Sequence, residues 1–443
     1  MASSPNSPTI LAIWTKEYQI THYTQPVFRA FATERLKKEL SVGDTVHRDY
    51  ISDFLVNDLG GDGAYSTQGF TDTDETLVVN AKKEVSMQIP EWQKIQQHLP
   101  TARKFAQKAM NRLWNQIDAV LLGNMITSAA NIVDDGSIGG VAGNPIVIST
   151  GNVMSVFSAA DTALLLSNVK YVPNKGFTGD VKKDGTDLMS CAAISPQVYQ
   201  ALTQFVGGKN SSKGDDVTTN GYVGYFFGFN TFVSNNLLWE GQLAMSVVPT
   251  ANDTFTLLSG VTINSTSQAL VFTFKASPAA AGDLVVADTA AHGATNVVAA
   301  LNAPYTTIAN TSSAGYYPLV KANLTYTQQY LLANMTASVV SSTTAKLLVT
   351  GYSSVPVSTS FTSASNKWAK QVQHNLLGTS QSIDLVMQKT PNLSIRPVSG
   401  KLADDYVTWN LFGYKVFNDQ VPQLVDVQID ASVLTASPTV KWA

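Results

Sequence analysis

Two glycine-rich segments contain the residue types that could bind a phosphate group through the backbone. They are Gly60-Gly61-Asp62-Gly63 and the stretch from Gly136 to Gly143. A phosphate-binding loop requires glycines between a strand and the N-terminus of a helix, and its best-known form ends in Lys followed by Ser or Thr. Neither segment is followed by that pair, and neither lies in that setting. Both are interpreted as loop tips, and no cofactor is expected.

The patterns required for nucleophilic or metal chemistry are also missing. No Gly-x-Ser-x-Gly occurs, which a serine hydrolase of the nucleophile-elbow type would need. Asp72, Asp74 and Glu75 offer the oxygen ligands that Ca²⁺ prefers, but their setting indicates the solvated flank of a hairpin. The histidines are scattered and unpaired, which argues against a zinc site: His22, His47, His98, His292 and His374. We therefore expect no catalytic residue, no metal site and no enzymatic activity.

The single cysteine and the overall charge exclude further classes. Cys191 has no partner for an internal disulfide, and its apolar surroundings from Leu188 to Ile194 indicate a thiol in the core. The formal net charge is −3 and no Lys/Arg run occurs, so tight or sequence-specific nucleic-acid binding is not expected. No stretch approaches the roughly 20 apolar residues of a membrane span, and residues 1–5 do not begin a signal peptide. We expect a protein of the cytoplasm with no membrane partner.

The composition is charge-poor, with 14% charged and 44% hydrophobic residues. Average soluble domains carry about 25% charged residues. An ordinary β-rich domain with a Ser, Thr and Asn surface would show the same deficit. A subunit whose surface is mostly covered by neighbours would show it too.

A long β-hairpin is predicted over residues 51–90. Hydrophobic residues alternate with polar ones from Thr76 to Ile89, which is the period of a half-buried strand. The segment from Tyr50 to Val56 provides the other strand, and the glycine-rich residues between them are too polar to bury. We expect this hairpin to project from its own subunit.

A long helix is predicted from Thr101 to Ala130. Thr101 follows Pro100 and is a suitable N-cap, and apolar residues recur at spacings of three and four, as in Leu113, Ile117, Val120 and Leu121. At 1.5 Å per residue the helix would be about 45 Å long, which suits an elongated subunit. Shorter helices are expected at Ala159 to Val169 and Pro196 to Phe205.

The composition changes sharply between Trp239 and Trp368. Eight charged residues fall in these 130 positions, about 6%, whereas the other 313 positions contain 53, about 17%. Strands are expected at Ala269 to Phe274 and Ala345 to Thr350, and a helix at Ala294 to Leu301. A break of this size indicates an inserted domain, and about 130 residues can form a core of their own. Its two ends should leave the host fold close together, so Leu237 and His374 are expected to be neighbours.

Three segments resemble, in order, the tailed-phage major capsid proteins with the Hong Kong 97-like fold. Leu77 to Trp92, leading into the long helix, is similar to the extended loop and spine helix of that family. Ala193 to Leu202, followed by Gly224 to Leu237, is similar to its strand-to-helix turn and its later passage ending in Ser-Asn-Asn-Leu. The closing strands of the family resemble Gly378 to Met387, Tyr406 to Trp409 and Leu411 to Val416. The order and spacing of these segments carry the resemblance, which covers about three fifths of the chain.

The resemblance implies an α+β capsid fold with five parts. These are an N-terminal arm (1–50), an extended β-hairpin loop (51–90), a spine helix with peripheral and axial domain segments (91–237), an inserted β-rich accessory domain (238–370) and closing strands (371–443). Some members crosslink through a lysine on the extended loop, but no lysine occurs from Leu55 to Ala81, so crosslinking is not implied.

The function implied is a major capsid protein that self-assembles into an icosahedral head shell around viral double-stranded DNA. Its partners would be many copies of itself in pentamers and hexamers, with scaffold, portal and decoration proteins as further candidates, and no sequence-specific DNA contact. The protein would be part of the virion and assemble in the host cytoplasm. The hairpin tip would then contact neighbouring subunits, through Gly60, Gly61, Asp62, Gly63, Tyr65 and Phe70.

Two alternatives remain open from the sequence. An encapsulin-like nanocompartment shell protein shares the fold type but encloses protein cargo. A virion surface or adhesive protein would instead place the function in the Ser/Thr-rich insertion, acting as a binding module.

Overall fold

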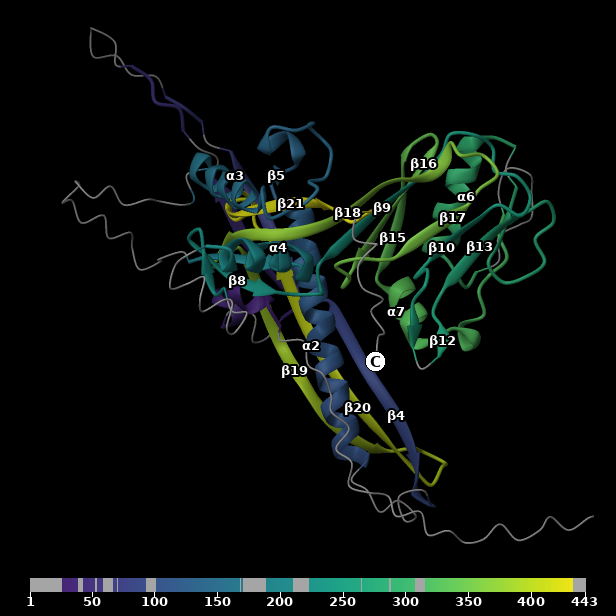
Figure 1. The fold of residues 1–443 in the computed structure, drawn as a ribbon. Coiled ribbons are helices and arrows are strands. Elements are labelled where there is room, and N and C mark those ends of the chain that lie inside the picture. Colours follow the sequence, from purple (N-terminus) through teal and green to yellow (C-terminus); the bar gives the residue numbers. More distant parts are fainter. Residues whose placement is uncertain are drawn as a thin grey trace, which may run out of the picture.

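The computed structural model describes residues 26–38, 43–51, 54–58, 67–69, 71–92, 101–167, 169, 189–209, 223–263, 265–286, 288–306 and 315–432, with the backbone alone at 101–106. Figure 1 shows an elongated molecule in which a long sheet and a long helix form one end. A central sheet joins this end to a separate lobe formed by the inserted block, and a thin hairpin extends from the opposite side. The α+β class expected from the sequence is confirmed.

The long helix is α2 (Thr101–Ser128), and it begins at the predicted residue and ends two residues earlier than predicted. It packs along one face of a sheet that we call the long sheet. Ile117 and Leu121 of the helix belong to the same apolar cluster as Met387 and Phe412 of the sheet. The order of its strands is β1 (Ala32–Thr33), β19 (Ile383–Pro397), β20 (Ala403–Lys415) and β4 (Ala81–Pro90).

The hairpin is formed by β2 (Thr45–Ile51) and β3 (Asp72–Val78), which pair antiparallel from Thr45–Val78 to Ile51–Asp72. We call it the arm. The single strand predicted from Thr76 to Ile89 is wrong, because the chain changes partners at Val79 and Asn80: β3 pairs with β2, whereas β4 pairs with β20. Hydrophobic alternation continues across this break, so periodicity cannot reveal the change of sheet.

The central sheet has nine strands and extends into the inserted block (Figure 1). Helices α3 (Val153–Leu166) and α4 (Pro196–Gly207) lie against it. Helix α3 begins six residues before its predicted start and ends three residues before its predicted end, whereas α4 begins at the predicted Pro196 and ends two residues later than predicted. Ser195 caps α4 by accepting a hydrogen bond from the Val198 N–H, and Pro196 occupies the first turn. The strands run in the order β15 (Met335–Ser341), β16 (Thr344–Thr350), β9 (Leu238–Met245), β18 (Asn366–Thr379), β6 (Ser190–Ile194), β8 (Phe229–Val233) and β7 (Tyr225–Phe226), with β21 (Leu424–Asp430) and β5 (Asn131–Val133) off this path.

The inserted block completes a hydrophobic core of its own around β9 and β16. Of the buried residues in this core, all except Ala431 lie between Trp239 and Val355. The helix predicted from Ala294 to Leu301 is α6 (Ala290–Asn302), and the two predicted strands are β13 and β16, whereas α7 (Tyr326–Ala333) was not predicted. A second sheet encloses the core, with the order β14 (Asp283–Val285), β13 (Leu270–Lys275), β10 (Thr254–Leu257) and β17 (Val357–Ser360), and a short hairpin pairs β11 (Thr262–Ile263) with β12 (Thr266–Ser267).

The two ends of the inserted block are neighbours, as expected. Leu238 is the cross-strand partner of His374, and the β9–β18 ladder continues outward to Met245 and Asn366. The block is nevertheless not a separate sheet, since β18 belongs to both parts.

A buried carboxylate joins the N-terminal segment to the long helix. Asp118 of α2 accepts hydrogen bonds from the Val27 and Phe28 N–H groups at 2.8 Å and from Asn236 Nδ2 at 2.9 Å. Burial raises the pKa of Asp118 to about 6, against the lowering effect of these hydrogen bonds. The side chain thereby fixes residues 27–28 beside the passage that leads into β9.

Candidate functional site

The arm is held to the body at its base by charged and polar contacts. Arg48 Nη2 lies 2.5 Å from Asp419 Oδ2, and its guanidinium lies 4.7 Å from the centroid of the Phe417 ring. From β3, Glu75 Oε1 accepts a hydrogen bond of 3.0 Å from the Asn418 N–H. Both strands of the arm are therefore attached to the same loop of the body.

An apolar cluster fixes the same base. Leu77 and Val79 are buried with Val386 and Phe417, and Val46 and Leu411 pack against them. In β2 and β3, inward residues such as Arg48, Glu75 and Leu77 therefore contact the body, and the residues between them point outward. The arm thus has a defined direction of exit from the subunit.

The outer part of the arm exposes large apolar side chains. Ile51 is 53% exposed, Phe54 62%, Leu55 78% and Val56 100%. The backbone at Leu55 is tied across the hairpin, since Leu55 N–H donates to Gln68 Oε1 and Gln68 Nε2 donates to the Leu55 carbonyl. Contiguous exposed apolar residues on a projecting element indicate a surface that another molecule covers.

The predicted tip residues themselves lie outside the described part of the chain. This applies to all six: Gly60, Gly61, Asp62, Gly63, Tyr65 and Phe70. Their assignment as an inter-subunit contact therefore remains a prediction.

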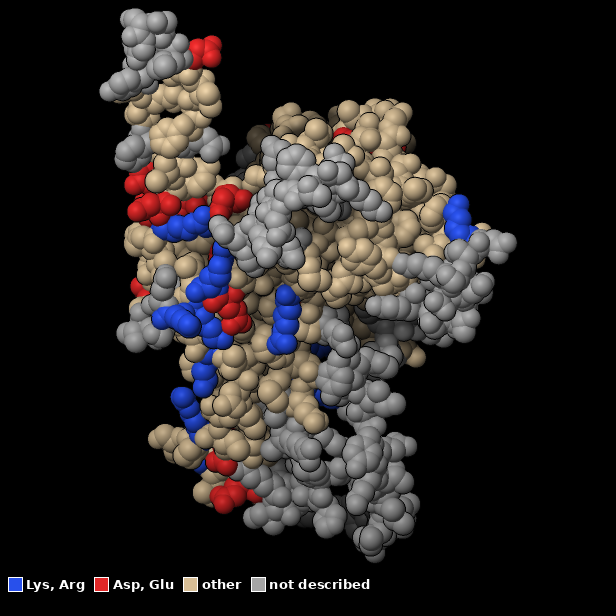
Figure 2. All heavy atoms as spheres, turned by 90° about the vertical axis from the view of Figure 1, so that its left-hand side faces the viewer, with Lys and Arg blue, Asp and Glu red and all other residues tan. Residues whose placement is uncertain are grey.

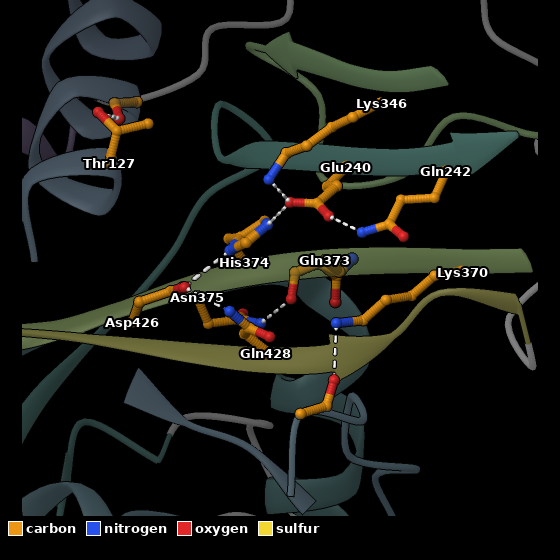
Figure 3. Close-up of polar contacts among 12 residues, drawn as sticks. Thr127, Glu240, Gln242, Lys346, Lys370, Gln373, His374, Asn375, Asp426 and Gln428 are labelled. Atoms are coloured by element: carbon orange, nitrogen blue, oxygen red, sulfur yellow. Dashed lines mark hydrogen bonds and ion pairs between the residues drawn. The ribbon is translucent and has the colours of Figure 1, made fainter. Parts of the chain in front are cut away.

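A second polar site lies where the inserted block joins the central sheet (Figure 3), and we call it the junction. His374 of β18 is placed between two carboxylates, with Nδ1 2.9 Å from Asp426 Oδ2 of β21 and Nε2 3.6 Å from Glu240 Oε2 of β9. The second distance is that of an ion pair and is too long for a hydrogen bond. Lys346 Nζ of β16 lies 2.6 Å from the same Glu240 oxygen, and Gln242 donates to Glu240 Oε1. Charges thus alternate across four neighbouring strands.

Burial makes these charges depend on one another. Glu240, His374 and Asp426 are each no more than 5% exposed. Burial alone would lower the pKa of His374, but Asp426 and Glu240 outweigh it and raise the pKa to about 9. Burial would likewise raise the pKa of Glu240, but His374, Lys346 and Gln242 lower it to about 2. The junction is therefore a set of paired charges at neutral pH, and it contains no nucleophile for these groups to activate.

We expect the junction to stabilise the subunit most strongly between about pH 4.5 and 6.5. The contribution of His374 is complete below its ordinary pKa of 6.5 and is lost as pH rises through 9. The contribution of Glu240 is complete above its ordinary pKa of 4.5 and is lost as pH falls toward 2. Asp426→Asn should cost about 3 kcal/mol or more at pH 6, because it leaves a buried cation with one partner fewer. Chemical denaturation of the protein and of the Asp426→Asn variant across pH 2 to 10 measures the pH dependence and the cost of the substitution.

The exposed His47–Asp74 pair of the arm is the matched control for the buried His374–Asp426 pair, and its Nδ1–Oδ2 distance is 2.7 Å. His47→Gln should change the free energy of unfolding little, since exposed ion pairs contribute little. Equal losses in the Asp426 and His47 variants would contradict the assignment of special stability to the junction.

The other candidate residues of the sequence do not converge on a chemical site. Among the described residues, no group of three or more His, Cys, Asp and Glu side chains could hold a metal ion. Asp72 and Asp74 point outward from β3, whereas Glu75 points toward the body. Cys191 is buried, as predicted, and burial raises the pKa of its thiol to about 11.

The glycine-rich loop from Gly136 to Gly143 already uses its backbone donors internally. Asp134 accepts from the Ser137 and Gly143 N–H groups, and Asp135 accepts from the Val141 N–H. Carboxylates of the chain itself thus occupy the position that a phosphate would require.

No protein-family profile matches the sequence, and no curated protein does. The structure is similar to solved structures of phages. One titled Mycobacterium phage Che8 matches with a TM-score of 0.50 at 11% identity, over 96% of this chain and 98% of that chain. The chain therefore shares its fold with that phage structure. At this identity the likeness establishes the fold alone.

Two further structures with similar coverage are explicitly titled as capsids. The capsid of cyanophage P-SCSP1u has a TM-score of 0.46 at 11% identity, over 94% of this chain and 92% of that chain. The capsid of Ralstonia phage GP4 has a TM-score of 0.46 at 7% identity, over 97% and 98%. Among the described residues, no helix is long and apolar enough to cross a membrane.

Proposed function

We propose that the protein is the major capsid protein of a tailed bacteriophage and assembles into the icosahedral shell of the head around double-stranded DNA. The observation that carries this proposal is the arm. It leaves a phage capsid fold in a fixed direction and exposes Phe54, Leu55 and Val56 far from any core of its own subunit. Such a surface is useful only when a neighbouring molecule covers it.

The partners are then many copies of the same chain in pentamers and hexamers, in a virion assembled in the host cytoplasm. Scaffold, portal and decoration proteins would meet this shell, and DNA would be retained by confinement. The protein acts as a structural subunit and not as an enzyme. The predicted tip residues Gly60 to Gly63, Tyr65 and Phe70 would extend the contact made by the arm.

The inserted block, residues 238–370, would be an accessory domain on the outside of the shell. Its separate core and the adjacency of Leu238 and His374 support this division. Its low charge offers nothing to DNA phosphates, which favours the outer face.

Electron microscopy of the protein expressed with the genes that neighbour its own tests the proposal. The expected result is closed shells or isolated capsomers. A monodisperse monomer in every condition, including coexpression, would refute the assignment.

A further inference from the structure

The outward face of the arm carries three carboxylates, two of which lack a partner among the described residues. Asp49 and Asp74 are direct cross-strand partners, and Asp72 lies beside them on the same face. Like charges in directly opposed positions destabilise a hairpin. His47 contacts Asp74, but neither Asp49 nor Asp72 forms a hydrogen bond or ion pair with another described residue. A cationic partner would relieve this repulsion.

A groove on the long sheet has the opposite charge. Its volume is about 480 Å³, and the residues that line it include Lys82, Lys83, Glu84, Ser394, Arg396 and Trp409. Lys389 lies next to it, with Nζ 5.8 Å from the centroid of the Trp409 ring. We call it the basic groove, since these four cations outnumber the two acids beside them, Glu84 and Asp405, the second of which is the cross-strand partner of Arg396. Neither Lys82 nor Arg396 forms an ion pair with another described residue.

We propose that the acidic outward face of the arm docks in the basic groove of a second copy of the chain. The inference rests on the proposed shell function and deepens it by naming the partner surface. Carboxylates of Asp49 and Asp72 would pair with Lys82 and Arg396. The apolar part of Trp409 would meet exposed Ile51, which lies between the two acids on the same face of the arm.

The arm is directed away from the basic groove of its own subunit. Its base is fixed by Arg48 and Glu75, and from there it extends away from the long sheet (Figure 1). Figure 2 shows Asp and Glu side chains on the arm, the column that rises at the upper left, and Lys and Arg side chains lower on the body. Unlike surfaces at separate places on one chain produce head-to-tail contacts, which form rings where the rotation between copies closes.

Charge reversal on each surface, followed by combination of the two, tests the pairing. The arm variant is Asp49→Lys with Asp72→Lys, and the groove variant is Lys82→Glu with Arg396→Glu. Each should raise the protein concentration required for half-assembly by at least about tenfold, because like charges then face each other. The variant with all four substitutions should have a half-assembly concentration within about threefold of that of the original protein. Sedimentation and electron microscopy measure assembly, and circular dichroism checks folding.

Two further variants separate assembly from folding. Lys367→Glu reverses an exposed cation of the inserted block, away from the groove, and should assemble normally. Asp49→Asn with Asp72→Asn removes the repulsion within the hairpin, so it should not reduce the stability of the subunit while it weakens assembly. A loss of folding in this variant would assign the carboxylates to the internal structure of the arm and overturn the proposal.

The experiment distinguishes failure of the proposed function from failure of the docking proposal. If the original protein forms no shells, the proposed function fails. If it forms shells and the groove variant assembles equally well, the function stands and the docking is refuted. If the groove variant assembles normally but its subunits bind short duplex DNA more weakly, the groove is a phosphate contact and the docking proposal is again overturned.

Discussion

Replacement of residues 52–71 by Asn-Gly should leave the subunit folded and abolish the closure of shells. Ile51 and Asp72 form the last pair of the arm ladder, so a two-residue turn can connect them directly. The truncation removes Phe54, Leu55 and Val56 but retains the Arg48–Asp419 and Glu75–Asn418 contacts at the base. Because loop length affects stability only logarithmically, the free energy of unfolding should change by no more than about 1 kcal/mol.

Light scattering and electron microscopy measure closure, and denaturant unfolding of the monomer measures stability. A full-length control, Phe54→Ser with Leu55→Ser and Val56→Ser, separates the apolar contacts from the length of the arm. It should weaken assembly without removing it, since the arm keeps its full length and its predicted tip residues. Unfolding of the truncated monomer would show that the arm is internal structure of the subunit.

Elements that depend on local sequence could be predicted, and elements that depend on distant partners could not. Helix α2 has a continuous apolar stripe and an N-terminal signal at Thr101, so its extent was predicted to within two residues. Helix α7 has a capping box, in which Thr325 and Gln328 bond each other's backbone. The Thr-x-x-Gln pattern is visible in the sequence, but a Ser/Thr-rich background makes it hard to distinguish.

The junction illustrates what the sequence could not provide. Glu240, Lys346, His374 and Asp426 are separated by many residues along the chain, and only the pairing of four strands brings them together. In the sequence His374 is one of five scattered histidines. Its burial between two carboxylates depends on strand register, which a single sequence does not reveal.

We expect that the inserted block can be deleted without unfolding the rest of the chain. The β9–β18 ladder shows where the cut ends can be joined. Replacement of residues 241–371 by Asn-Gly closes a hairpin at the Glu240–Val372 pair. It keeps Glu240, His374 and Asp426 and removes Lys346. Trp239 packs in the core of the block, so Trp239→Thr is added to avoid an exposed aromatic.

The truncated subunit loses contacts with α2 as well. Gln116 Nε2 donates to Asn334 Oδ1 at 2.6 Å, and the ladder between β9 and β16 disappears. We therefore expect a loss of stability on the order of 1–3 kcal/mol, with folding preserved. Assembly should produce shells that lack an outer protrusion in electron micrographs.

Expression of residues 238–374 alone tests whether the inserted block folds by itself. Every buried member of the block's core except Ala431 is present in this fragment, and so are both strands of the β9–β18 ladder. It should therefore unfold cooperatively as an independent domain. A folded fragment together with an insoluble truncated subunit would mean that the rest of the chain depends on the block to fold. An unfolded fragment would mean instead that the composition break at Trp239 and Trp368 is not a domain boundary, since the core would then need support from α2 and β21.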